Sequence, residues 1–317
     1  MNPIKLCADL QLCFAGLFVS CRSWLDFIHY RKSAMVKVVT DSSCDIPPEI
    51  ANKLSITIVP LCIEFGGKTY RDGIDIDVDR VYHELAHGQE TPKTSVPPPT
   101  DFIEVYNNLA AESDQIISIH LASGYSGTYN TATLAKSYLD NGCRVEVIDS
   151  NSASIGLGLM VIAAAQAAQE GKNLDQIVDL VHQTMPRVRI FGKNDNFPYI
   201  LQGRRLRMTN LLIALGKISM ALHIKLLGEI YNGGKVRSPA FVVGLQMALN
   251  RLKRWAKSCE DIKELAIAYS TIPQEAEMLA ECLEPLFPRE RILITRFGCV
   301  TSTYLGPGTL AMALIQG

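Results

Sequence analysis

Hydroxyl and carboxylate side chains gather directly after three short apolar runs of this chain. The three clusters are Thr40-Asp41-Ser42-Ser43, Ser123-Gly124-Tyr125-Ser126-Gly127-Thr128 and Asp149-Ser150-Asn151-Ser152. Each precedes a helical pattern, and parallel strands of an open α/β sheet bring such turns to one edge, where ligands bind. Taken singly, each turn is typical of a helix cap. Three together predict a site for an anionic oxygen group, because hydroxyls and unpaired helix amides can both donate to it.

Ser126 is also a candidate nucleophile. A nucleophilic serine needs a base within hydrogen-bond reach, usually a histidine oriented by a carboxylate. His120, at the end of the preceding apolar run, is the one local candidate. Binding needs less, since hydroxyls and amides alone can satisfy a carboxylate or a phosphate. A binding site is therefore favoured, and a serine-dependent acyl hydrolase or transferase stays open as an alternative.

A second alternative is a zinc hydrolase. His83-Glu84-Leu85-Ala86-His87 matches the H-E-x-x-H pattern, in which two histidines one helical turn apart hold zinc and the glutamate acts as base. The apolar residues of this helix, however, share the face opposite His83 and His87, where solvent is expected. The match is therefore interpreted as a solvated helix face, and no metal or other cofactor is predicted.

The elements that must position these side chains follow from length and composition. The chain has 317 residues, of which 48% are hydrophobic and 20% charged, so it can bury a sizeable core. Its formal net charge of −1 gives no basic excess and argues against nucleic-acid binding. Nine cysteines without metal spacing favour buried thiols and a cytoplasmic protein. The sequence contains no run of 18 apolar residues, so no transmembrane helix is predicted.

Alternating strand and helix patterns predict an α/β fold with two domains. We expect an N-terminal parallel βαβ domain over residues 35–150 and a C-terminal α/β domain over residues 151–317. Asp45 is expected to cap the short helix that follows the first strand. Residues 1–34 stand apart as an extension. We expect either that the start codon is assigned too far upstream, with the working protein beginning at Met35, or that residues 1–34 are a weak signal-like segment.

Several of these segments together resemble the DegV family. Residues 38–47 resemble its opening strand and turn, and Thr94-Ser95-Val96-Pro97 resembles its Thr-Ser-Gln-Pro loop, with Val96 in place of glutamine. Ser126-Gly127-Thr128-Tyr129 is similar to its Leu-Ser-Gly-Thr-Tyr turn, with Tyr125 in place of the leucine. The order and spacing of these motifs hold from residue 36 to residue 171.

The resemblance continues more loosely in the second half. Gly203-Arg204-Arg205-Leu206 is similar to a Gly-Gly-Arg-Ile pattern with Arg204 for the second glycine, and residues 223–227 carry Leu226 where the family has proline. Residues 233–237 resemble a turn leading to the family's Lys-Val-Arg. Residues 303–308 resemble a Thr-His-x-Gly-Pro-Gly motif with Tyr304 in place of histidine. Tyrosine can still donate a hydrogen bond but carries no charge near neutrality.

The resemblance implies a two-domain carrier, with no catalysis of its own, that encloses one long-chain fatty acid in an internal tunnel. The family's partner is a fatty acid kinase, which converts the presented acid to acyl-phosphate for phospholipid synthesis. Such a carrier is compatible with transient contact with a membrane surface. The residues expected to bind the carboxylate are Thr94, Ser95, Ser126, Gly127 and Tyr304. Arg205 and Arg237 are the candidates for contact with an acyl-phosphate or with the kinase.

Overall fold

A four-stranded parallel sheet forms from the apolar runs that the sequence marks as strands. The computed structural model describes residues 35–88, 90–140, 142–195, 224–231 and 235–317. The strand order in this sheet is β2-β1-β6-β7, with bounds Ile56–Val59, Lys37–Asp41, Gln115–His120 and Arg144–Asp149. All three pairings are parallel, so the carboxyl ends of β1, β6 and β7 meet at one edge, as predicted.

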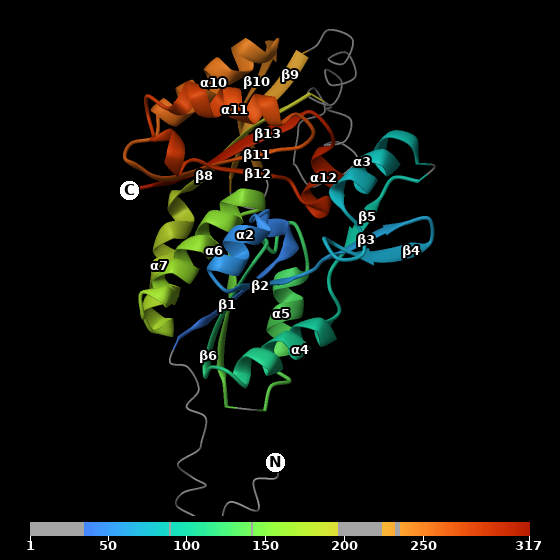
Figure 1. The fold of residues 1–317 in the computed structure, drawn as a ribbon, viewed down its shortest axis with the longest axis vertical. Coiled ribbons are helices and arrows are strands. Elements are labelled where there is room, and N and C mark those ends of the chain that lie inside the picture. The colour runs from blue at the N-terminus through green and yellow to red at the C-terminus, as the bar shows by residue number, and fades with distance from the viewer. Residues whose placement is uncertain (1–34, 89, 141, 196–223, 232–234) are drawn as a thin grey trace, which may run out of the picture. The chain divides into compact units, whose positions relative to one another are not determined.

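Helices cover both faces of this sheet (Figure 1). On one face α4 (Pro99–Ala110) and α5 (Thr128–Lys136) pack through Phe102, Tyr106 and Ala132. On the other face lie α2 (Pro48–Lys53), α6 (Ser154–Gln169) and α7 (Leu174–Thr184). A short 3₁₀ helix, η2 (Ser42–Cys44), follows β1, and a second, η3 (Met185–Arg187), follows α7. The mixed α/β class expected from the sequence is confirmed.

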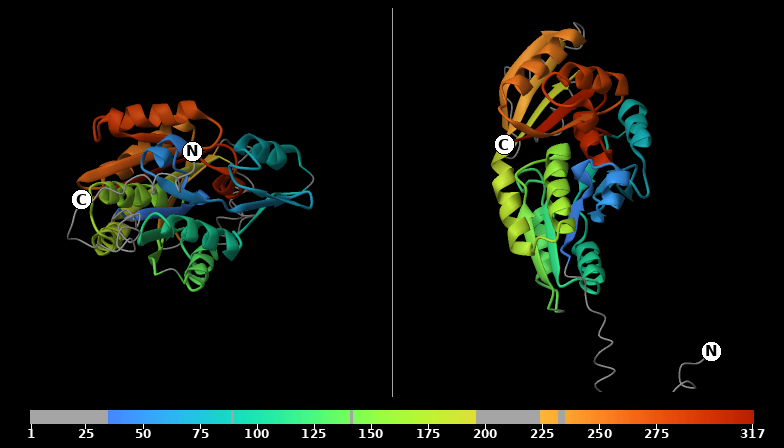
Figure 2. Two further views of the ribbon diagram at one scale, coloured as in Figure 1. Left: turned by 60° about the horizontal axis from the view of Figure 1, so that its bottom comes forward. Right: turned by 60° about the vertical axis from the view of Figure 1, so that its left-hand side comes forward.

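A second, mixed sheet is built from residues after Arg187. Its strand order is β10-β9-β8-β13-β11-β12, with bounds Lys235–Val243, Ile224–Tyr231, Val188–Asn194, Thr309–Gln316, Ile262–Tyr269 and Leu293–Arg296. Only the β11–β12 pairing in this order is parallel. Helices α10 (Leu245–Lys257) and α11 (Pro273–Leu283) cover one face, as Figure 2 also shows. A 3₁₀ turn, η5 (Arg289–Arg291), leads into β12.

Helix α6 packs against both sheets. Its residues Leu157 and Val161 belong to the core on the parallel sheet, whereas Ile155 and Leu159 belong to a core with Ile190 of β8 on the mixed sheet. A helix that is apolar on every side, as α6 is, needs such burial all round. The domain boundary at residue 150 remains a prediction, and the packing of α6 and α7 on the parallel sheet favours a boundary nearer η3.

Two glycines let α6 approach its neighbours. A Cβ on Gly156 would lie 2.5 Å from Ile190 Cδ1, and a Cβ on Gly158 would lie 2.5 Å from the carbonyl oxygen of Cys44. Side chains at these positions would therefore force the mixed sheet or η2 away from the helix. The close approach at Gly156 and Gly158 holds the start of α6 between the two layers, beside the site described below.

A third, three-stranded antiparallel sheet has the order β4-β3-β5, with bounds Lys68–Arg71, Cys62–Phe65 and Lys93–Ser95. Ile63 of this sheet shares a small core with Val81 of α3 (Val78–His87) and Val300 of α12 (Cys299–Leu305). Helix α12, which lies near the C-terminus, is thereby packed against a sheet of the N-terminal half. No helix within the described ranges is both long and apolar enough to cross a bilayer.

Candidate ligand-binding site

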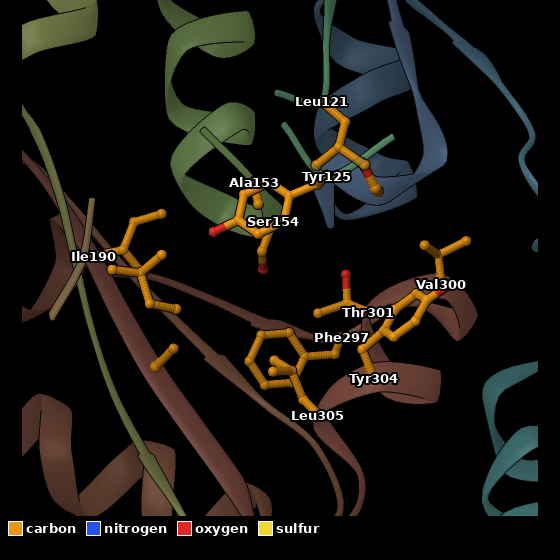
Figure 3. Close-up of a pocket in the computed structure, with 13 residues that line it drawn as sticks. Leu121, Tyr125, Ala153, Ser154, Ile190, Phe297, Val300, Thr301, Tyr304 and Leu305 are labelled. Atoms are coloured by element: carbon orange, nitrogen blue, oxygen red, sulfur yellow. The ribbon is translucent and has the colours of Figure 1, made fainter. Parts of the chain in front are cut away.

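An apolar cavity lies beside the first turn of α6. Its lining comes from the parallel-sheet layer, from the mixed sheet and from α12, and includes Leu121, Tyr125, Ile190, Phe297 and Leu305 (Figure 3). The empty space measures about 790 Å³, including the part open to solvent. The lining residues that the structure describes include no charged side chain. The cavity therefore suits the apolar part of a ligand.

Hydroxyl groups gather at the α12 side of this cavity. Tyr304, which lines it, forms a hydrogen bond with Thr94 Oγ1 of β5. The Val96 side chain lies 3.6 Å from the position that a Cβ on Gly127 would occupy, so the β5 loop adjoins the turn that carries Ser126. The structure thus brings Thr94, Tyr304 and the 126–127 turn into one region, although they lie far apart in the sequence.

Ser95 is oriented differently. Its Oγ donates to Glu64 Oε1 of β3, and the Cys62↔Ser95 pairing places it on the opposite face of the small sheet from Thr94. Adjacent residues of a strand point to opposite faces. Of the neighbouring pair, Thr94 contacts Tyr304 and Ser95 contacts Glu64.

His120 is not available to Ser126 as a base. Its Nδ1 lies 3.0 Å from Asp41 Oδ2 and its Nε2 lies 2.6 Å from Ser118 Oγ, so both ring nitrogens are engaged in a buried network. Ser126 Oγ instead lies 2.9 Å from Thr128 Oγ1. The one local base considered for a serine mechanism is therefore committed to the packing of β1 against β6.

The network around His120 continues through Ser118 on one side and through Asp41 on the other. The hydroxyl of Tyr106 donates to Ser118 Oγ, and Leu121 N donates to Asp41 Oδ2. Burial alone would raise the pKa of Asp41, but the hydrogen bonds and charge of His120, with help from Ser43, hold it below its ordinary value. Asp41 is therefore a buried carboxylate that fixes the edge of the parallel sheet below the cavity.

Asp45 does not cap α2, contrary to the expectation from the sequence, because the helix begins at Pro48 after Pro47. Asp45 adopts a left-handed conformation (φ 52°), and its carboxyl is buried. It accepts hydrogen bonds from Gly298 N at 2.8 Å, Thr301 Oγ1 at 2.9 Å and Ser154 Oγ at 2.5 Å. Asp45 thus ties α12 to the first turn of α6, and Ser154 and Thr301 both line the cavity.

A second buried carboxyl supports the same end of α12. Asp72 Oδ1 accepts from Cys299 N at 3.3 Å, while its Oδ2 has no partner among the described atoms. Burial raises the pKa of Asp72, and burial with repulsion from Asp72 raises the pKa of Asp45 to about 7. Both carboxyls therefore favour the protonated state more than exposed ones do.

The zinc-like pair on α3 is exposed. His83 and His87 have ring centroids 4.9 Å apart, and Nδ1 of His87 lies 3.2 Å from the His83 carbonyl oxygen. No set of three histidine, cysteine, aspartate or glutamate side chains that could hold a metal occurs in the part of the chain that the structure describes. The third ligand that a zinc site would need is not found there.

The two predicted arginines have different outcomes. Arg205, with Arg204, lies outside the described residues. Arg237 is on β10, where its Nε and an Nη each lie 3.1 Å from the carboxylate of Glu229. Whether either arginine contacts an acyl-phosphate or a kinase stays a prediction.

Sequence reasoning missed several residues of the site. Ser154 stands close behind the third polar turn and could have been included with it. Thr301 and the apolar wall at Ile190 carry no local signal, because their roles depend on contacts between distant segments. Tyr125 belongs to the second polar turn but was not proposed as a site residue; it lines the cavity directly beside Ser126, and burial raises the pKa of its hydroxyl.

Fold and site together define an α/β protein whose two main sheets border an apolar cavity with hydroxyl groups at one side. A family model described as "Uncharacterised protein, DegV family" matches residues 35–317, so the chain belongs to the DegV family. It is 35% identical over 283 residues to a DegV domain-containing protein of Caldanaerobacter subterraneus, covering 86% of this chain and 95% of that one.

Solved structures agree with this assignment. A DegV family protein from Thermus thermophilus, described for its fatty acid binding, superimposes with a TM-score of 0.78 at 26% identity, covering 89% of this chain and all of that one. DegV of Bacillus subtilis, a fatty acid binding protein, has a TM-score of 0.73 at 27% identity, with 90% of this chain and 100% of that chain covered. The two-domain fold expected from the resemblance is confirmed.

Proposed function

We propose that this protein binds one long-chain fatty acid in the apolar cavity and carries it without chemical turnover. The observation that carries the proposal is the uncharged cavity beside the Thr94–Tyr304 hydroxyl pair, in a fold shared with fatty-acid-binding relatives. Burying an acyl tail stabilises the complex by roughly 0.8 kcal/mol per methylene. A dozen methylenes thus contribute about 10 kcal/mol before ordering costs are subtracted.

The carboxylate would bind at the hydroxyl end. An unpaired carboxylate cannot be buried without a cost of several kcal/mol. In this proposal Thr94 Oγ1, Ser126 Oγ, the Gly127 backbone and the Tyr304 hydroxyl would pair with it. Helix α5 begins at Thr128, so its positive end adds to the attraction. Ser95 would act on this site through Glu64 by holding β5 in place.

Removing two of these hydroxyls should strip the protein of its ligand. In a Thr94→Ala/Ser126→Ala double variant, two hydrogen bonds to a charged group are lost, each contributing about 1.5–3 kcal/mol. Bound fatty acid, measured by mass spectrometry of an organic extract after mild purification, is expected near one per wild-type chain and below about a tenth of that in the variant. Thr133→Ala is the control, because Thr133 lies on the exposed side of α5 and its hydroxyl donates to the Tyr129 carbonyl. A wild-type protein with no lipid would contradict the proposal.

Tyr304 should contribute through its hydroxyl alone. Tyr304→Phe keeps the ring against the cavity but removes the partner of Thr94, so fatty-acid affinity is expected to fall about five-fold to ten-fold, equivalent to about 1 kcal/mol. Tyr304→His, which restores the histidine of the family motif, should bind at least as tightly as wild type. Titration of delipidated protein with hexadecanoic acid measures both. Equal affinity of Tyr304→Phe and wild type would remove this residue from the proposed head-group site.

The carrier would present its carboxylate to a fatty acid kinase, which is the role that the family resemblance implies. Its test is acyl-phosphate formation from the bound acid when a fatty acid kinase and ATP are added. A serine-dependent hydrolase is disfavoured because His120 is committed to Asp41 and Ser118. Labelling of Ser126 by a covalent serine probe would reverse this preference.

A further inference from the structure

We propose that a second polar site adjoins the apolar cavity on the side away from Tyr304 and binds an oxygen-bearing group at the far end of the acyl chain. The preferred ligand class would then be a long chain that is polar at both ends, such as an α,ω-dicarboxylic acid. This inference rests on the proposed fatty-acid binding and deepens it by naming the class of chain.

Two cavities meet at this place. The second cavity shares Tyr125, Ala153, Ile190 and Ile230 with the apolar one, so the two are neighbours across these four side chains. In Figure 3, Ile190 and Tyr304 stand on opposite sides of the apolar cavity. A chain whose carboxylate lies at Tyr304 would therefore direct its far end past Ile190 toward the second cavity.

The second cavity differs from the first in its chemistry. Its polar lining residues are Asn151, Ser152, His182, Arg189 and Arg237. The carboxylate of Glu229 is buried and is paired with the guanidinium groups of both Arg189 and Arg237. These three side chains together carry one net positive charge, and the ion pairs with Glu229 hold the two guanidinium groups in position. This lining suits a carboxylate better than a terminal methyl group, and it would give Arg237 a role at the far end of the chain in place of contact with an acyl-phosphate at the head group.

One further feature points to an anionic or oxygen-bearing group. Helix α6 begins at Ser154 without a side-chain cap, so its first amides and its positive end lie next to this cavity, which Ala153 lines. These amides would add to the attraction that the two guanidinium groups exert on a terminal carboxylate.

The test compares hexadecanoic acid with hexadecanedioic acid, which differ only at the far end. Delipidated wild-type protein is expected to bind the diacid at least as tightly as the monoacid. Arg189→Met, which keeps much of the side-chain stem, should weaken the diacid about ten-fold or more and leave the monoacid within about two-fold. Arg187→Met, an exposed arginine outside this lining, should change neither affinity.

The outcomes separate this inference from the function on which it rests. Wild-type binding of the diacid about a hundred-fold weaker than of the monoacid would overturn the second site, because it shows an apolar end to the tunnel. Equal weakening of both acids by Arg189→Met would overturn it too, since the carboxylate of the monoacid would then lie in the second cavity. Failure of both acids to bind would contradict fatty-acid binding itself.

Discussion

Replacing Asp41 with alanine is expected to lower the free energy of unfolding by about 3–5 kcal/mol. The carboxylate is inaccessible to solvent and accepts hydrogen bonds from His120 Nδ1, Leu121 N and the Ser43 backbone and hydroxyl. Removing it leaves these donors buried without a partner, at the point where β1 and β6 end beneath the cavity. Urea unfolding followed by circular dichroism measures the loss.

A surface aspartate provides the matched control. Asp175 pairs with Arg144 at 2.7 Å, but its side chain is 70% exposed. Because exposed ion pairs contribute about 0–1 kcal/mol, Asp175→Ala should change stability by less than about 1 kcal/mol. If Asp41→Ala cost no more than this control, the buried network would not be what holds the edge of the parallel sheet.

The free energy of unfolding of wild type minus that of Asp45→Asn is expected to fall by about 2–3 kcal/mol between pH 5 and pH 8. Burial, followed by the weaker repulsion from Asp72, raises the folded-state pKa of Asp45 from 3.8 to about 7. The unfolded chain loses this proton near pH 4 and the folded chain keeps it to about pH 7. The folded state therefore binds more protons in this window, so the stability contributed by Asp45 is lost as pH rises through it.

Asparagine resembles the protonated carboxyl and does not titrate, so the variant should lack this component of the pH dependence. Denaturant unfolding at pH 5, 6, 7 and 8 is the measurement. Asp75→Asn is the control, because its pairing with Arg71 lowers the Asp75 pKa to about 2, far below this range. A wild-type minus Asp45→Asn difference that stays constant across the range would show that Asp45 is ionised in the fold throughout.

Local patterns of the sequence were sufficient for the parallel sheet but not for the site. The runs at residues 36–39 and 115–120 form the central strands β1 and β6, because a strand buried on both faces needs a mostly apolar sequence. Residues 144–148 alternate polar and apolar side chains and form the less buried edge strand β7. Placing the polar turns at one edge then follows from parallel pairing. These inferences use only neighbours along the chain.

The remaining parts of the site depend on contacts between distant segments. Aspartate is a residue type that often caps helices. Nothing near Asp45 in the sequence indicates that Gly298 and Thr301 donate hydrogen bonds to it. The Thr94–Tyr304 pair joins residues 210 positions apart. Each residue was proposed separately as a carboxylate ligand through the family motifs, and their contact with each other was not predicted, because packing between segments this far apart leaves no periodic trace in a single sequence. The apolar wall at Ile190 was missed for the same reason.

Helix α6 gives the molecule one cooperative core in place of two separable ones. Leu157 and Val161 complete the interior of the parallel-sheet layer, and Ile155 and Leu159 complete that of the mixed-sheet layer. Melting of either layer would expose one side of a helix that is apolar on all sides, and so would remove support from the other layer. The two halves should therefore unfold in a single transition. Proteases would then cleave the folded chain at its surface loops and would not release either half as an independent domain.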